Sequence, residues 1–383
     1  MNPSFSSSPL LRSSSSRLTQ LTTHLRQQPK QQLYGGHHIA NIGSDTTTMT
    51  GASPSSSSIA APWRKSFMSH IETMDSPEFV LSTIHRVSAS RPSPPLMYVP
   101  RARTCIFRGL WADLNVNPKN DAPLNPAGLW TSDLLTFTTD CRMEKMEELF
   151  GDVLAEQFGR AGVLGSPTTD KVGEELWEEG LRKDKGKADR DSTPRDKKEN
   201  KDRLKGCGGG APVEAVFWIK EPSVQWRFRG RAYVIAPDVE TSPEGREVMT
   251  MLQSRMRKPE KGELKSKPDG DEKEQKQKDW SFARELTAHF GNCSPVMRGT
   301  FRNPPPGQPI SSPIDDGLGL GQKVTDLDDP VARANFRVVV IVPGVIDCAD
   351  LSDGEHPKRW IYTYVGGGEG NAGGDWEVAE VWP

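Results

Sequence analysis

Two segments of the sequence carry the residue types of an anion-binding site. The first, residues 101–109, has the composition of a short strand with an apolar centre, bracketed by Arg103 and Arg108. Arginine is costly to bury without an anionic partner, because its guanidinium stays charged at every physiological pH. Such a strand could bring cations to the mouth of a site. Two solvent-exposed arginines on an ordinary strand are an equally good interpretation of this segment alone.

The second segment places hydroxyl groups and cations at the start of a predicted helix. Residues 133–140 have the composition of a strand, and Thr138 and Thr139 close it just before Arg142 and Lys145. Hydroxyls and free backbone N–H groups at a helix start can hydrogen-bond phosphate oxygens, whose charge the two cations would neutralise. The alternative is that both cations pair with glutamates on the surface of the same helix.

Residues 213–231 contain the clearest period-two pattern of the sequence. Apolar residues alternate over residues 213–219 and again after a turn at residues 221–223, which predicts an antiparallel hairpin. The polar positions of the second strand are an amide and three guanidinium groups, Gln225, Arg227, Arg229 and Arg231. Solvated arginines on the outside of a sheet are the alternative here, and for each arginine the commoner outcome.

The composition is that of a folded domain with disordered additions. Hydrophobic residues make up 34% of the 383 residues, which is low for a globular protein, but 10 Trp and 13 Phe exclude a wholly disordered chain. The formal net charge of −2 argues against general attraction to nucleic acid or to anionic membranes. The arginine clusters are therefore interpreted as local sites.

The cysteines and glycines exclude several familiar kinds of site. Five widely spaced cysteines without a C-x-x-C pair predict neither a disulfide framework nor a metal site, and they indicate a reducing compartment. The glycine-rich residues 317–321 are not a dinucleotide fingerprint, because no strand precedes them and their spacing is wrong. The longest aliphatic run, residues 338–342, is far shorter than the ~20 residues that cross a bilayer, so no membrane span is expected.

Residues 1–60 form a tail that cannot build a core, because serine, threonine, glutamine and small residues dominate it. No acidic residue precedes Asp45, whereas arginine and lysine are spread through the segment. This pattern is typical of a mitochondrial transit peptide. The alternative is a disordered tail without a targeting signal. Translation from Met49 would remove most of the segment. The protein is expected in the mitochondrion or the cytoplasm.

Two tracts rich in both charges, at about residues 182–210 and 257–279, are predicted to be disordered insertions in surface loops. Their few apolar side chains could not offset the entropy of ordering. Without the tail and these tracts, residues 61–383 form one domain of generous size.

The remaining elements predict a mainly β fold of the α+β type. Strands are expected at residues 79–87, 101–109, 133–140, 336–342, 359–364 and 376–382 besides the hairpin, and helices at residues 62–74, from 141 and at 280–290. Strands joined by short turns, without a βαβ rhythm, indicate a mostly antiparallel barrel with peripheral helices.

Four separated motifs together resemble the pyridoxamine 5'-phosphate oxidase-like family, in the branch of FMN-binding domain proteins. They are P-R-A-R-T-C-I-F-R-G at 100–109, T-F-T-T-D-x-R-x-x-K at 136–145, V-x-W-I-K-E-P-x-x-Q-W-R-x-R-G at 216–230, and a terminal R-W-x-Y with W-x-V-x-x-x-W-P. The resemblance covers about residues 61–383 without the charged tracts. It implies an FMN-binding split β-barrel of the antiparallel Greek-key type, and a homodimer with FMN at the subunit interface.

The resemblance also assigns the cofactor-binding residues. Arg103 and Arg108 would flank the flavin, with the backbone from Thr104 through Ile106 to Phe107 along the isoalloxazine ring. The ribityl phosphate would be held by Thr138, Thr139, Arg142 and Lys145. Gln225 and Arg359 resemble the glutamine and the C-terminal arginine near the ring.

Departures from the family leave the activity open. True pyridoxine-phosphate oxidases carry R-x-H-D-R on the C-terminal strand, and its first arginine and histidine engage the substrate. Residues 355–359 retain only the last arginine, so oxidation of pyridoxamine phosphate is not expected. Two hypotheses remain: a flavin-dependent oxidoreductase of unknown substrate, or a protein that binds FMN without turnover. The histidines His85, His289 and His356 are candidate bases by residue type only.

Overall fold

The computed structural model describes residues 60–87, 97–150, 204–259, 279–366 and 375–383. The predicted tail, Met49 and the greater part of both charged tracts lie outside the described residues. Within the described part of the chain, no helix is long and apolar enough to cross a membrane.

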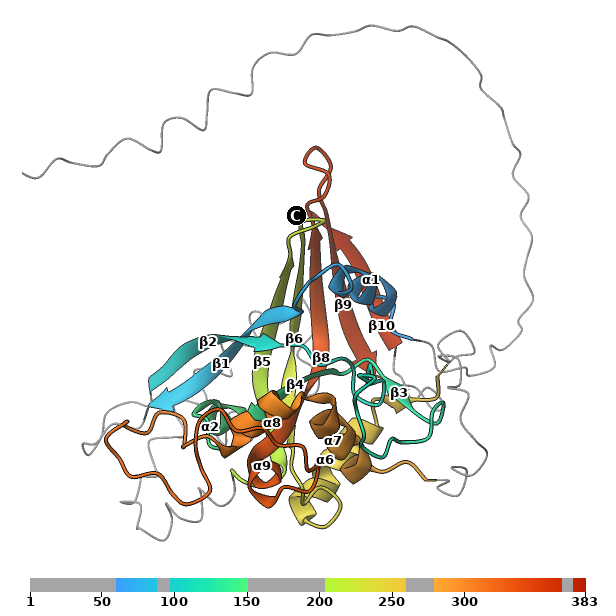
Figure 1. Cartoon of the computed structure of the whole chain (residues 1–383). Helices are drawn as coiled ribbons and strands as arrows, with labels where there is room; N and C mark the ends of the chain where they lie inside the picture. Colours follow the sequence, from blue (N-terminus) through green and yellow to red (C-terminus); the bar gives the residue numbers. More distant parts are fainter. Residues whose placement is uncertain (1–59, 88–96, 151–203, 260–278, 367–374) are drawn as a thin grey trace, which may run out of the picture. The chain divides into compact units, whose positions relative to one another are not determined.

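The fold is built on one large antiparallel sheet (Figure 1). Its strands pair in the order β10-β9-β8-β6-β5-β1-β2, and β4 pairs with the first half of β8, on the edge whose second half pairs with β9. The bounds are β1 Glu78–Val87, β2 Met97–Ile106, β4 Leu135–Asp140, β5 Gly208–Ile219, β6 Val224–Ile235, β8 Phe336–Asp350, β9 Lys358–Gly366 and β10 Asp375–Val381. Every described pair is antiparallel, and β3 (Thr131–Ser132) pairs with β7 (Met256–Arg257) apart from this sheet. The predicted mainly β, antiparallel class with peripheral helices is confirmed.

Regular strand pairing leaves the sheet open between β2 and β4. Part of this opening is bridged by the residues that follow β2: Arg108 donates its backbone N–H to Thr136, Thr136 donates to Gly109, and Trp111 donates to Leu134, at 2.8–2.9 Å. The path from β1 through β2, β4, β8, β6 and β5 thus returns to β1. This arrangement is consistent with the predicted split β-barrel.

The helices lie at the periphery, and several of them begin at a side-chain cap. They are α1 Arg64–Ile71, α2 Lys145–Phe150, α6 Pro243–Gln253, α7 Phe282–Asn292, α8 Pro295–Gly299 and α9 Pro330–Asn335, with a 3-10 turn at Thr300–Arg302. Ser242 and Ser281 cap α6 and α7 by accepting a backbone N–H three residues later. Figure 1 shows α6, α7, α8 and α9 gathered around one end of the long strands.

Two hydrophobic clusters hold these layers together. The first lies on the inner face of the sheet under α1, where the Phe67 ring packs 5.1 Å from Phe217 and 4.7 Å from Phe228, centroid to centroid. The second fills the space between β8 and the helices α6 and α7. Strand β8 belongs to both: Val339 faces the first and Val340 the second. Burial of both faces explains its continuous aliphatic run.

A bulge in β8 keeps its apolar residues aligned with the first cluster. Arg229 pairs with Val345 and Gly230 with Pro343, so Gly344 is one extra residue on β8. The extra residue reverses the alternation, which brings Ile346 into the cluster that odd-numbered residues reached before it. Gly230 is required opposite the bulge, since a Cβ there would lie 2.1 Å from the carbonyl oxygen of Val342.

Several predicted boundaries differ from the structure. Gly208–Gly210 belongs to β5 rather than to the first charged tract, and Arg257 is fully buried in β7 rather than opening the second. The second helix begins at Lys145, after turns at residues 141–144, instead of at Cys141. Strand β8 runs on to Asp350, past the predicted end at residue 342, because the bulge accommodates Pro343 and Gly344. Helix α6 was not predicted.

Candidate functional site

The two predicted motifs lie on β2 and β4, beyond the point where these strands part. Their backbones are hydrogen-bonded at Arg108 and Thr136, and because the strands are antiparallel, the residues before Arg108 run alongside those after Thr136. In the described strands β2 pairs only with β1, so its other edge is unpaired over residues 97–106. The motifs at 103–106 and 138–145 are therefore carried on the two edges of this opening.

The residues of β2 alternate between the two faces of the sheet. Arg103 lies opposite Leu81, on the face that also holds the buried Phe107. Thr104 lies opposite Val80 and is exposed, and Ile106 shares its face. The side chains of this motif thus lie on both faces of the sheet. The feature common to both faces is the backbone along the unpaired edge of β2.

Arg103 is already paired inside the chain. Its guanidinium donates to Thr83 Oγ1 on β1 and to Glu148 Oε2 on α2. The carboxylate of Glu148 is buried and also accepts the Thr83 hydroxyl. Arg103 therefore joins β1, β2 and α2, and a flavin would meet an arginine whose charge is compensated.

Arg142 is held still more completely. Its Nε and Nη2 donate to the Oδ1 and Oδ2 atoms of Asp140 at 2.9 and 2.6 Å, and further bonds reach the backbone carbonyls of Asn303 and Phe301. Its partner is thus Asp140, and not a glutamate of the helix. A phosphate could reach this guanidinium only in competition with a bidentate ion pair.

Lys145, in contrast, has no ion pair among the described contacts. Its ammonium lies 3.1 Å from Thr139 Oγ1 and 3.1 Å from the thioether of Met143, which are both uncharged. Burial lowers the pKa of Lys145, and Arg103 acts in the same direction. Thr138 points to the opposite face of β4, where its neighbour across the strands is Val338. The structure therefore brings Lys145 and Thr139 together and leaves Thr138 apart.

Arg108 is the second predicted cation without an ion pair in the described region. Its backbone N–H is bonded to Thr136, whereas its side-chain Nε is buried and has no hydrogen-bond partner. Its charge adds to burial in lowering the pKa of His289 on α7. The side chain thus lies on the α7 side of the sheet.

Gln225 and Arg359 occupy a separate part of the sheet. Gln225 pairs with Trp218 and Ala349, and Arg359 makes two hydrogen bonds to Asp347, at 2.9 and 2.8 Å, which raise the pKa of Arg359. Along the order of paired strands, Gln225 on β6 is three strands from β2, and Arg359 on β9 is five strands from it. No contact among the described residues joins either side chain to β2 or β4, and their assignment to the ring stays a prediction.

The three histidines differ in their surroundings. His289 is buried, and its ring stacks on Trp111 at 5.7 Å. His356 is exposed beside Asp353. His85 lies 3.6 Å from Glu148, next to the α2 end of the opening. Glu148, Asp140 and Asp347 were not predicted, because nothing in the sequence indicates which cation an isolated carboxylate will contact.

Fold and site together define a mainly β domain with an opening suited to a phosphorylated cofactor. Residues 60–164 match the family described as pyridoxamine 5'-phosphate oxidase, FMN-binding domain. This segment of the chain is similar to that family, which is the family that the four motifs resemble, and FMN is the cofactor that the family indicates. The match includes the motifs on β2 and β4. The assignments on β6 and β9 lie outside the matched residues and stay predictions.

Two solved structures are similar to the chain, both with low sequence identity and low TM-scores. A pyridoxamine 5'-phosphate oxidase-related, FMN-binding protein from Nostoc punctiforme PCC 73102 is 14% identical, covers 85% of this chain and 100% of its own, and has a TM-score of 0.40. PhzG from Burkholderia lata 383, in complex with tetrahydrophenazine-1-carboxylic acid, is 10% identical to this chain. It covers 86% of this chain and 100% of its own, with a TM-score of 0.33. No relative was found among curated protein sequences.

The described residues fit FMN at its phosphate end and along its ring. A partly buried ammonium without a carboxylate partner suits a phosphate, because burial makes an uncompensated charge costly. Unpaired backbone groups on the edge of β2 can hydrogen-bond the polar edge of a flavin. Lys145 and Thr139 would hold the phosphate, and residues 104–106 would lie along the ring.

Proposed function

We propose that the protein is an FMN-dependent oxidoreductase whose substrate remains to be identified. The observation that carries the proposal is Lys145, the cation beside the opening that has no ion pair among the described contacts. Because FMN carries a phosphate dianion, one charge-assisted bond to this ammonium would stabilise the complex by about 1.5–3 kcal/mol. FMN, when bound, supplies the capacity to accept a hydride from a substrate.

The residues of the chain orient and polarise the site. The edge of β2 would fix the plane of the ring through backbone hydrogen bonds, and Thr139 would support Lys145 at the phosphate. Arg108 brings a second cation without an ion pair, which would favour negative charge on a reduced ring. Its buried Nε has no hydrogen-bond partner among the described residues.

The proposal includes a homodimer. No described contact joins Gln225 or Arg359 to β2 or β4 within one chain, and a dimer would let both residues act on FMN held by a second copy. The outer face between them and β2 is also unusually apolar for a surface, with Trp218 47% exposed and Val80 and Ile84 exposed on β1. Such a face is suited to burial against its own copy.

The second candidate function is FMN binding without turnover. It is favoured by the pairing of Arg359, the one retained residue of the family's substrate-binding stretch, with Asp347. An arginine committed to a carboxylate on its own sheet is less available to a substrate anion.

Reduction of the bound flavin separates the two candidates. The full chain would be saturated with FMN and mixed anaerobically with NADPH or with pyridoxamine phosphate, while the flavin absorbance is followed. Rapid bleaching by either compound supports an oxidoreductase. A flavin that is inert to both supports the binding protein, and failure to bind FMN at all contradicts both.

A further inference from the structure

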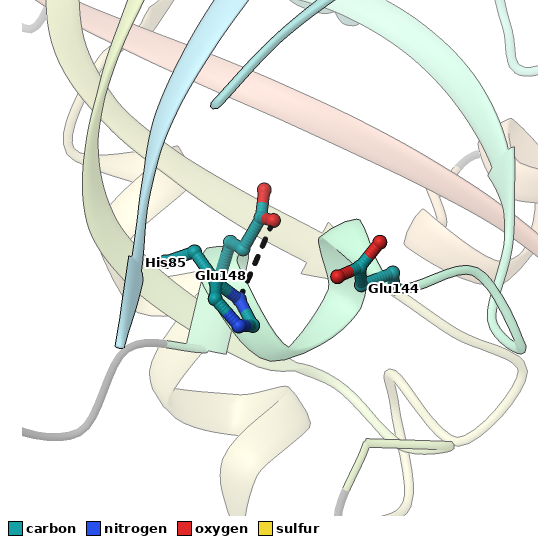
Figure 2. Close-up of side chains that lie close together, drawn as sticks. All are labelled: His85, Glu144 and Glu148. Carbon is teal, nitrogen blue, oxygen red and sulfur yellow. Dashed lines mark ion pairs between the residues drawn. The ribbon is translucent and has the colours of Figure 1, made fainter. Parts of the chain in front are cut away.

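A histidine and two glutamates converge beside the opening, at the contact between β1 and α2. They are His85 on β1, Glu144 just before α2, and Glu148 one turn further along the helix (Figure 2). Their ligand atoms all lie within 4.8 Å of one another. Positions i and i+4 share one helix face, which explains how both glutamates reach the same histidine.

Glu148 points a buried oxygen without a hydrogen-bond partner into this cluster. The residue is only 4% exposed, and its Oε2 accepts hydrogen bonds from Thr83 and Arg103. Its Oε1 has no hydrogen-bond partner and lies 3.6 Å from Nδ1 of His85. Carboxylates that bind a metal are typically held by hydrogen bonds of their own, and Thr83 and Arg103 hold Glu148 in this way while its Oε1 is directed into the cluster.

The donor set is that of a divalent transition metal. One imidazole and two carboxylates suit Zn²⁺ or Mn²⁺ better than they suit Ca²⁺, which prefers an all-oxygen shell of six or more ligands. The neighbouring cations do not exclude a metal ion. Arg103 is matched by Oε2 of Glu148, and Arg101 forms only an exposed ion pair with Glu144 at 3.1 Å, which is worth little.

We propose that His85, Glu144 and Glu148 bind one divalent transition-metal ion that fastens α2 to β1. Glu148 and His85 provide the partly buried side of the site, and Glu144 closes it from the surface by exchanging Arg101 for the metal. Thr83 and Arg103 orient Glu148 without touching the metal. The sequence alone predicted no metal site, because β2, β3 and β4 lie between His85 and the two glutamates in the chain.

Calorimetric titration of the chelator-treated full chain with Zn²⁺ tests this site. We expect one tight equivalent per chain. His85→Gln and Glu144→Gln should each weaken it by at least about 100-fold, since loss of an outer-shell partner alone costs about 10–100-fold. Zn²⁺ should also raise the thermal unfolding temperature of the wild type and not that of His85→Gln. Glu148→Gln is less informative, because it would also leave Arg103 without its partner.

Two control variants distinguish the site from general attraction of Zn²⁺ to the chain. Glu147→Gln removes the same charge from an exposed position of the same helix, and it should leave the affinity unchanged. Arg101→Gln removes the competitor for Glu144, and it should leave the affinity unchanged or raise it. Wild-type affinity in both His85→Gln and Glu144→Gln would overturn the proposal, as would an equal loss in Glu147→Gln.

Discussion

Lys145 Nζ lies 3.1 Å from the hydroxyl of Thr139, and no carboxylate forms an ion pair with it among the described residues. Three of the four predicted arginines, Arg103, Arg142 and Arg359, are ion-paired within the chain. Lys145 is thus the predicted phosphate-binding cation without an ion pair among the described residues. A phosphate placed there would compensate a charge that the fold leaves without a partner, whereas at Arg142 it would displace one that is already compensated.

Lys145→Ala should therefore weaken FMN binding by about 10–100-fold, the equivalent of one charge-assisted hydrogen bond. The affinity for riboflavin should change little, because riboflavin lacks the phosphate. Both affinities can be measured by quenching of flavin fluorescence. Arg101→Ala, which removes an exposed cation of β2, is the control and should alter neither. Equal losses for FMN and riboflavin would show that Lys145 does not hold the phosphate.

Arg142→Ala should act mainly on stability. It removes a bidentate pair with the buried Asp140 and the links to the carbonyls of Phe301 and Asn303, so we expect a loss of about 2–4 kcal/mol in the free energy of unfolding. Urea denaturation measures this loss. Asp140→Asn should cost a similar amount, and the two effects should not add. If the free energy of unfolding were unchanged and only the affinity for FMN fell, Arg142 would bind the phosphate and this prediction would be wrong.

Local patterns predicted the elements of this fold well. Alternation identified the β5–β6 hairpin, because each strand has one buried face, and helical spacing identified α1. Helix α6 was missed even though Ser242 and Pro243 are typical of a helix start, since its apolar residues Val248 and Leu252 form only a narrow stripe. The bulge at Gly344 could not be predicted, because it depends on the pairing of Gly230 with a strand more than 100 residues away.

The candidate site was predicted in part. The motifs on β2 and β4 were placed correctly on two strands that part from each other. The sequence could not show that Arg142 would form an ion pair with Asp140, or Arg103 with Glu148, because ion pairing depends on distances that only the fold determines. For the same reason it grouped Thr138 with Thr139, although neighbouring residues of a strand point to opposite faces.

Trp218→Glu tests the proposed homodimer. Trp218 is half exposed on the outer face, opposite Gln225, and a carboxylate there would be costly to bury against a second copy. We expect the wild type to elute as a dimer, and the variant to shift toward the monomer, in size-exclusion chromatography with light scattering. Trp382→Glu, at a position 93% exposed near the C-terminus, is the matched control. A wild-type protein that is monomeric at all concentrations would contradict the proposal.

Glu285 and His289, one turn apart on α7, are predicted to be uncharged together near pH 5–6. Burial raises the pKa of Glu285 to about 7 and lowers the pKa of His289 to about 3, although the two groups lie only 3.9 Å apart. Glu285 stabilises the fold fully below its unfolded pKa of about 4.5, and this contribution is lost as the pH rises to about 7. The contribution of His289 is present above about 6.5 and is lost as the pH falls toward 3, so the two slopes oppose each other between pH 4.5 and 6.5.

Glu285→Gln removes only the first of these slopes. A glutamine can still accept the hydrogen bond from Asn125, which Glu285 receives at 2.8 Å, so the fold should be kept. The variant should gain stability relative to the wild type as the pH rises from about 4.5 to about 7.5, on the order of 2–3 kcal/mol. Urea denaturation at pH 4.5, 6 and 7.5 measures the difference, with the exposed Glu147→Gln as the control. A difference that stays flat over this range would mean that Glu285 is ionised in the folded protein, and that its charge is compensated by a partner despite its burial.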